Sequence, residues 1–135
     1  MAIFDSNVVL YLALSSGPKS LRAGSLMAQG GAISVQVLNE CANVLRTKQS
    51  QLWSEVYAFL YGLRMRFKLH PVTVDLHQNG LHLAERYGFA VYDSFIVAAA
   101  LAAGCDTLWS EDMQDGMVAD GRLTITNPFS TPLAS

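Results

Sequence analysis

Short apolar runs alternate along the chain with longer stretches that have the periodicity of a helix. The short runs are bounded by polar or turn-forming residues, as strands are. We predict four strands, at 2–5 (AIFD), 32–34 (AIS), 106–110 (DTLWS) and 122–126 (RLTIT). Residues 68–74 are expected to be extended around Pro71.

The segments between these strands predict helices with one apolar face. We expect helices at 6–17, with Ser6 as N-cap, and at 19–31, 34–47, 52–67, 75–88 and 92–104. The helix at 34–47 should bury Val37, Leu38, Cys41, Val44 and Leu45. The helix at 92–104 is apolar on nearly all sides, so it should lie at the centre of the fold.

Strands that alternate with helices predict an α/β fold, a three-layer α/β/α sandwich with a mainly parallel central sheet. The 135 residues suffice for a single domain over 1–135. The longest apolar run, 95–103, is about half of the roughly 20 residues that a membrane-spanning helix needs. The start of the chain lacks the basic region of a secretory signal. We therefore expect a cytoplasmic protein without membrane contact, and its two isolated cysteines fit a reducing compartment.

Charge is distributed unevenly, although the net charge is only −2. Residues 41–74 carry a net charge of +4, whereas residues 75–120 carry −7. A basic region can attract phosphate and an acidic region can collect cations. The chain could therefore bind nucleic acid despite its acidic total.

Four carboxylates fall where the strands end or where the next helix begins. Asp5 ends the first strand, Glu40 lies on the helix after the second, Asp93 begins the buried helix, and Asp112 follows the strand at 106–110. Functional crevices in open parallel sheets lie outside the carboxyl ends of the strands. We expect these four acids to meet at one edge of the sheet.

Such a cluster would repel itself unless cations bound there. Oxygen ligands without His or Cys suit Mg²⁺ or Mn²⁺, and two such ions can support phosphodiester hydrolysis. Each acid alone also has a simpler interpretation, as a helix cap (Asp5, Asp93), a flanking charge (Glu40) or a turn residue (Asp112). Their joint placement favours a metal site.

Four segments give the chain a resemblance to a known family: FDSNVVLY, ISVQVLNECANVLRTK, YGFAVYDSFIVAAALAAGCDTLWSEDMQDG and the terminal ITNPF. Together they resemble a PIN domain, in particular the VapC-type toxins of bacterial toxin–antitoxin pairs. The family's D-x-N opening matches Asp5 and Asn7, and its later acids match Glu40, Asp93 and Asp112. Ser6 replaces the commoner Thr, and Cys41 stands where Phe or Val is frequent; neither affects the acids.

The resemblance implies an endoribonuclease that depends on Mg²⁺ or Mn²⁺, held by Asp5, Glu40, Asp93 and Asp112, with water attacking phosphorus. It also implies an RNA substrate, a homodimer and an inhibitory VapB-type antitoxin. A PIN nuclease of RNA processing or quality control, and a PIN-like domain that binds without cutting, are alternatives. A phosphoacceptor receiver domain is a remote one, because the last lysine is Lys68 and such pockets include a later Lys.

Other polar residues near these acids have secondary roles to test. Asn7 and Ser110 can orient carboxylates or act as cap and strand end. Glu111 can hold a water or a second metal, whereas Asp115, before Gly116, is expected to be a turn residue. Arg46 and Lys48 are candidates for contact with RNA phosphates, although basic residues also favour helix ends.

Histidines and aromatic residues are expected to be structural. His77 and His82 are five residues apart and do not share a helix face, so these two and His70 are assigned surface or structural places. The helical spacing of Trp53, Tyr57, Phe59 and Leu60 favours core or dimer packing over base stacking.

Overall fold

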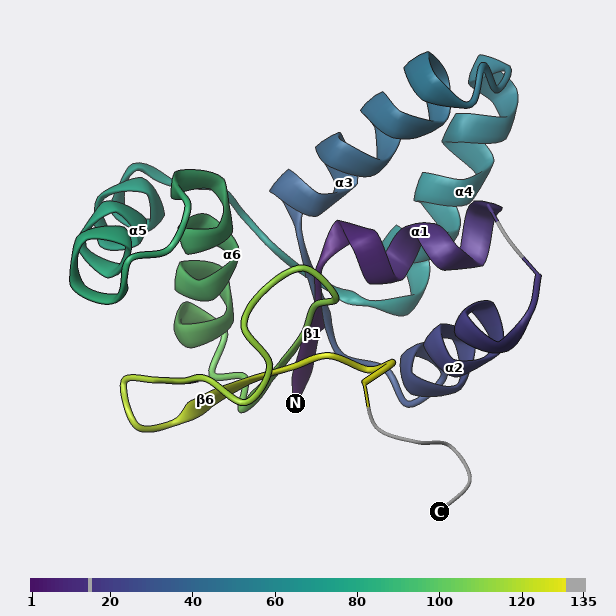
Figure 1. Cartoon of the computed structure of the whole chain (residues 1–135). Helices are drawn as coiled ribbons and strands as arrows, with labels where there is room; N and C mark the ends of the chain where they lie inside the picture. Colours follow the sequence, from purple (N-terminus) through teal and green to yellow (C-terminus); the bar gives the residue numbers. More distant parts are fainter. Residues whose placement is uncertain (15, 131–135) are drawn as a thin grey trace.

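The computed structural model describes residues 1–14 and 16–130, which form a central sheet covered by helices on both faces (Figure 1). The strands are β1 (Ala2–Phe4), β2 (Ala32–Ser34), β3 (Lys68–His70), β4 (Thr107–Trp109), β5 (Val118–Ala119) and β6 (Leu123–Thr126). Their order in the sheet is β3-β2-β1-β4-β6-β5, and only β5 is antiparallel to its neighbour. The central strand β1 pairs Ile3 with Ala32 of β2 and Leu108 of β4.

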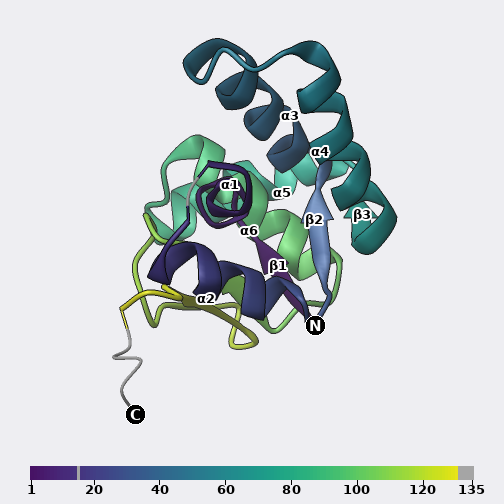
Figure 2. The same ribbon diagram turned by 90° about the vertical axis from the view of Figure 1, so that its right-hand side faces the viewer.

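The helices form the outer layers. They are α1 (Ser6–Leu14), α2 (Pro18–Met27), α3 (Val35–Asn43), the π-helix η1 (Val44–Lys48), α4 (Trp53–Arg66), α5 (Val74–Tyr87) and α6 (Val91–Ala102). Figures 1 and 2 show α5 and α6 on one side of the sheet and α1 and α2 on the other. The pair α3 and α4 projects beyond the sheet (Figure 1).

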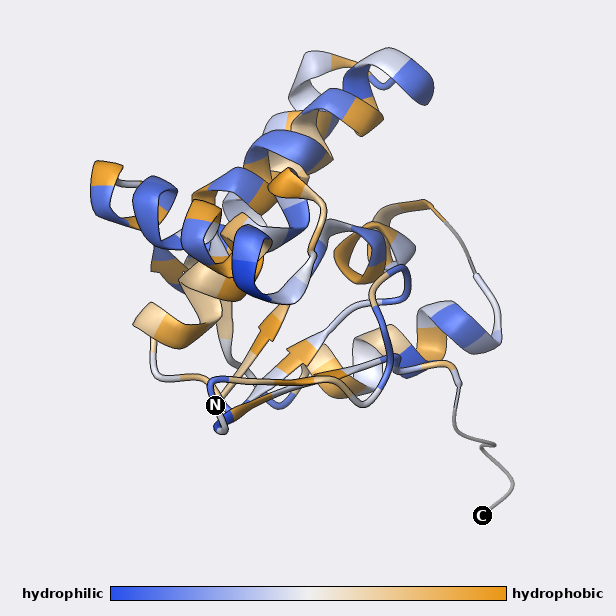
Figure 3. Cartoon of the chain, turned by 60° about the vertical axis from the view of Figure 1, so that its left-hand side comes forward, coloured by the Kyte–Doolittle hydropathy of each residue, from blue (hydrophilic) through white to orange (hydrophobic). Residues whose placement is uncertain are grey.

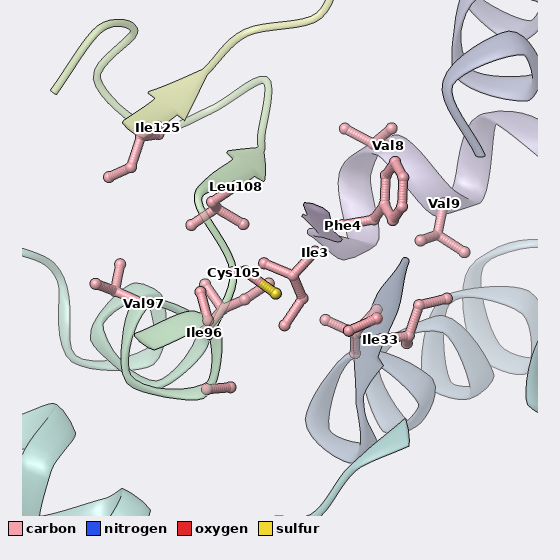
Figure 4. Packing of buried hydrophobic residues seen from close by; sticks show 14 of the residues in the cluster. Ile3, Phe4, Val8, Val9, Ile33, Ile96, Val97, Cys105, Leu108 and Ile125 are labelled. Atoms are coloured by element: carbon pink, nitrogen blue, oxygen red, sulfur yellow. The ribbon is translucent and has the colours of Figure 1, made fainter. Parts of the chain in front are cut away.

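The core lies between the sheet and both helix layers. Ile3, Phe4, Ile33, Leu108 and Ile125 of the strands are fully buried, and Figure 4 shows them beside side chains of α1 and α6. Figure 3 shows hydrophobic residues along the central strands, whereas the helices carry both hydrophobic and hydrophilic positions. This is the division expected of a sheet covered on both faces.

The predicted α/β sandwich is confirmed, with small differences at the element ends. The helix expected at 6–17 ends at Leu14, and Ser6 is its first residue rather than its cap. The Asp5 carboxylate instead accepts the Ser6 N–H at 2.7 Å. In the helix that follows β2, Val37, Leu38, Cys41 and Leu45 are buried as predicted, whereas Val44 is only partly buried.

The sequence pattern does not predict two of the strands. The segment expected only to be extended forms the edge strand β3, parallel to β2. The two residues of β5 pair antiparallel with β6, too short a run for any periodicity.

The helix α6, which carries Asp93, is fixed closely against α5. A Cβ on Gly80 of α5 would lie 2.4 Å from the Phe95 ring of α6, so only glycine permits this approach. Seven residues of α6 are buried, as expected of a central helix. Within the described ranges, no helix is long and apolar enough to cross a membrane.

Candidate active site

Asp5 is the most constrained carboxylate at this edge of the sheet. Its backbone N–H donates to the Trp109 carbonyl of β4 at 3.0 Å, which extends the sheet pairing beyond β1. Its Oδ1 accepts the Ser6 N–H at 2.7 Å, and its Oδ2 accepts the Ser110 hydroxyl at 2.8 Å. The residue is only 8% exposed. Sheet and helix therefore present one oriented carboxylate group.

Asp112 lies in the loop that follows β4 and is held by Asn7. The Asn7 amide Nδ2 donates to Asp112 Oδ2 at 3.2 Å and to Ser110 Oγ at 3.4 Å. The Asn7 Oδ1 accepts the Glu111 N–H at 3.2 Å. Asn7 therefore joins the start of α1 to the loop that carries Asp112, the geometry predicted for a residue that orients a carboxylate.

Glu40 and Asp93 complete the cluster from two further helices. Both are partly buried, Glu40 on α3 and Asp93 in the first turn of α6. The Ser6 side chain acts to lower the pKa of Glu40, and α1 contacts α3. The N-cap of α6 is Ala90, so Asp93 is not the cap that its sequence position alone would allow.

The four acids act on one another electrostatically. Burial and the nearby Asp93 and Asp112 charges raise the pKa of Asp5, against the lowering effect of its Ser110 and Ser6 hydrogen bonds. Burial and Asp5 raise the pKa of Glu40, and burial and Asp112 raise the pKa of Asp93. In residues 1–14 and 16–130, no lysine or arginine forms an ion pair with any of the four. The sheet edge is thus a concentration of negative charge.

This arrangement predicts an unusual pH dependence of stability in the absence of divalent metal. A carboxyl whose pKa is raised by folding destabilises the folded chain when ionised, and the penalty disappears as the pH falls through the raised pKa. From neutral pH down towards the ordinary carboxyl range near pH 4, the melting temperature in EDTA should therefore rise. Below that range it should fall, because hydrogen bonds lower the pKa values of Asp106 and Asp115 and their contribution is lost on protonation. Thermal melts in EDTA from pH 7 to 3 measure this, and a steady fall from pH 7 would contradict it.

The donor set fits a hard divalent cation better than any other group. Four carboxylates supply only oxygen, the ligand type that Mg²⁺ and Mn²⁺ prefer. Within the part of the chain that the structure describes, no three His, Cys, Asp or Glu side chains are gathered closely enough to hold one ion as they stand. The cluster therefore has the chemistry of a metal site, with its side chains apart.

Other predicted residues lie elsewhere. Arg46 and Lys48 are exposed on η1, at the end of α3 farthest from the sheet, and Arg46 packs over the Trp53 ring at 4.9 Å. Asp115 is the predicted turn residue: its carboxylate accepts the Asn127 N–H and the Ser130 hydroxyl, both at 2.8 Å.

Glu111, which the sequence predicts as a candidate to hold a water or a second metal, is paired within the chain. Both of its carboxylate oxygens already have partners, the Tyr11 hydroxyl and the Lys19 ammonium group. Neither partner was singled out from the sequence. Tyr11 could have been noticed because it lies four residues after Asn7, on the same face of α1.

The cysteines and histidines take no part in the cluster. Cys41 and Cys105 are buried and free, and burial with the Glu40 charge raises the pKa of Cys41 to about 12. The thiol next to Glu40 therefore stays protonated and packs as an apolar group. His77 and His82 are exposed on α5, and His70 is partly buried at the end of β3.

The aromatic residues of α4 correct part of the prediction. Phe59 and Leu60 pack against the core as expected. Trp53 and Tyr57 do not: they are 52% and 65% exposed. Of the two kinds of packing expected, core packing is therefore wrong for these two residues, and dimer packing stays a prediction.

Comparison with known proteins places this geometry in context. The sequence model of the family described as PIN domain matches residues 2–114. No curated protein matches the chain in sequence at a significant level.

Solved structures share the fold at low sequence identity. A toxin–antitoxin complex from Klebsiella pneumoniae matches with a TM-score of 0.74 at 17% identity, over 96% of this chain and 98% of that one. VapC20 of Mycobacterium tuberculosis, a toxin that cleaves the sarcin–ricin loop, matches with a TM-score of 0.68 at 17% identity, over 83% and 90%. VapBC2 of Rickettsia felis, solved bound to a DNA fragment from the promoter, matches with a TM-score of 0.68 at 18% identity, over 93% and 97%. These likenesses establish the fold.

Proposed function

Because the chain belongs to the PIN domain family and collects four carboxylates at one edge of its sheet, we propose that it is a divalent-metal-dependent endoribonuclease and the toxin of a type II toxin–antitoxin pair. The observation that carries the proposal is the mutual repulsion of these acids. A fold keeps such a costly cluster where a bound cation uses it. Family membership also excludes the receiver-domain alternative.

Asp5, Glu40, Asp93 and Asp112 would hold Mg²⁺ or Mn²⁺ in this proposal. When bound, the metal would supply a nucleophile from water at neutral pH and stabilise the charge that develops on the phosphate. The Asp5 carboxylate has a fixed orientation, because the Ser110 hydroxyl and the Ser6 amide each donate a hydrogen bond to one of its oxygens. Asp112 is more exposed and reaches the site from a loop. The four side chains would draw together once a cation offsets their repulsion.

The individual residues have distinct parts in this scheme. Asn7 orients Asp112, and Ser110 orients Asp5, each through a hydrogen bond to one carboxylate oxygen. Ser6 acts to lower the pKa of Glu40. Arg46 and Lys48 would contact RNA phosphates away from the acids, because a polyanion needs cations to offset the charge of the site.

The partners follow from the same proposal. One of the similar structures, from Klebsiella pneumoniae, is a toxin–antitoxin complex. We therefore expect a VapB-type protein antitoxin. The exposed Trp53 and Tyr57 of α4 form an apolar surface that suits a homodimer interface.

Brief expression in a bacterial host tests the nuclease and toxin parts together. Growth should stop within minutes of induction, new RNA ends should accumulate at defined sites, and co-expression of the protein encoded beside the chain should restore growth. Sequencing of RNA ends before and after induction identifies the substrate. New RNA ends without growth arrest would favour a nuclease of RNA processing. If folded protein is abundant but neither growth arrest nor new RNA ends appear, the proposal is contradicted.

A further inference from the structure

Glu111 stands next to Asp112, yet its side chain points to a different set of partners. Its Oε1 accepts the Tyr11 hydroxyl at 2.9 Å, and its Oε2 forms an ion pair with Lys19. Glu111 is 22% exposed and Lys19 is 51% exposed at their side chains. The charge of Glu111 is therefore offset within the chain, unlike that of its neighbour.

The segment after β6 packs against Tyr11, Lys19 and Glu111. The Phe129 ring packs edge-on against Tyr11, with ring centroids 5.0 Å apart, and Lys19 Nζ lies 5.2 Å from the Phe129 centroid. The Asn127 amide Nδ2 donates to the Glu111 carbonyl at 3.4 Å. These residues come from α1, α2, the loop after β4 and the chain beyond β6. They meet only through the fold.

We propose that Tyr11, Lys19, Glu111, Asn127 and Phe129 form a clamp that holds the loop 110–116 in the conformation that presents Asp112 to the metal. Glu111 is then a positioning residue and not a metal ligand. The inference rests on the proposed function, since it gives Asp112 a metal to bind. It also gives a role to Asn127 and Phe129, which lie beyond the residues 2–114 that match the family.

The hydrogen bonds of the loop explain why a clamp is needed. Asp112 is exposed, and among the described residues its carboxylate accepts a hydrogen bond from the Asn7 amide alone. The Glu111 N–H reaches the same Asn7 side chain, so a shift of Glu111 would displace both contacts. At the far end of the loop, Asp115 accepts the Asn127 N–H, and the Gly116 N–H donates to Ile125 at 2.7 Å. The clamp thus fixes the loop at the end where Asp112 lies.

Amide hydrogen exchange of the metal-free chain tests the clamp without any reference to activity. In Glu111→Ala, the backbone amide of residue 111 should exchange about tenfold faster, because this end of the loop opens more often, whereas the Gly116 amide, held by Ile125 at the far end, should change less. Glu111→Gln, which keeps an acceptor of the same shape, should show a smaller change. Glu85→Ala, which removes an exposed acid of α5, is the control and should leave both amides unchanged.

Titration with Mn²⁺, followed by the loss of its free-ion electron paramagnetic resonance signal, tests the link to Asp112. Loss of a partner of a ligand typically costs 10- to 100-fold in metal affinity, so Glu111→Ala should raise the Mn²⁺ dissociation constant about tenfold. Lys19→Met and Tyr11→Phe should raise it less, and each should add little when combined with Glu111→Ala. They also replace Glu111→Ala as the test if that variant does not fold.

Two results would overturn the clamp: unchanged exchange in Glu111→Ala, or a Glu111→Gln variant as impaired as Glu111→Ala while Lys19→Met is normal. The second result would make Glu111 itself a ligand. An unmodified chain that binds no Mn²⁺ would instead contradict the proposed function, while the exchange measurement would still decide whether the clamp holds the loop.

Discussion

Replacing Asp93 with asparagine is expected to reduce RNA cleavage by about a thousandfold, or about 4 kcal/mol of transition-state stabilisation. Asn keeps the size of the side chain and one oxygen, but it removes the charge that would attract a divalent cation. Within residues 1–14 and 16–130, no group donates a hydrogen bond to the Asp93 carboxylate, so the substitution should leave the fold intact. The rate of cleavage of a defined RNA by purified protein measures the effect.

Glu85→Gln provides the matched control for this loss. Glu85 lies on α5, which packs against α6, and its side chain is exposed. The substitution changes the net charge by the same amount without touching the cluster, so cleavage should stay within about twofold of the unmodified rate. Near-normal cleavage by Asp93→Asn would mean that the acids of the sheet edge do not carry out the chemistry.

The second large effect is that of Asp93→Asn on the melting temperature. We expect the substitution to lower the melting temperature relative to the unmodified chain in Mn²⁺ and to raise it in EDTA. A ligand that binds only the folded state at a hundred times its dissociation constant stabilises by about 2.7 kcal/mol. Mn²⁺ at that level should therefore raise the melting temperature of the unmodified chain by on the order of 10 °C. In EDTA, Asp93→Asn should melt above the unmodified chain, because burial and the Asp112 charge raise the pKa of Asp93 and the ionised form opposes folding.

Calorimetry measures the melting temperatures of the unmodified chain and of Asp93→Asn, each in EDTA and in Mn²⁺. We expect Asp93→Asn to lose the response to Mn²⁺ and to be more stable than the unmodified chain in EDTA. Such a pairing of lost function with gained stability is typical of sites whose side chains repel one another. A variant that is less stable in EDTA and still responds to Mn²⁺ would show that Asp93 serves the fold and not the metal.

The sequence predicts β1, β2, β4 and β6, and it places Asp5 and Asp112 at the carboxyl ends of β1 and β4, because both follow from local patterns. Asp5 follows an apolar run and Asp112 follows another, and parallel strands end at the same edge. The bonds between those strands put the two carboxylates in electrostatic contact. Ser110 and Asn7 were also found, since they lie next to these acids in the sequence.

Contacts between distant segments could not be predicted in the same way. The pairing of Glu111 with Lys19 joins residues that are 92 positions apart, and no local pattern encodes it. The exposure of Trp53 and Tyr57 shows a second limit. Helical spacing tells which residues share a face, but whether another element covers that face depends on the whole fold.

The chemistry of the cut RNA ends tests the central claim most directly. If a divalent cation held by Asp5, Glu40, Asp93 and Asp112 activates water for in-line attack, the purified chain should leave a 5′-phosphate and a 3′-hydroxyl. Cleavage should require Mg²⁺ or Mn²⁺ and stop in EDTA. Products that end in a 2′,3′-cyclic phosphate, formed equally well in EDTA, would contradict the account, because attack by the RNA's own 2′-hydroxyl needs no metal at this site.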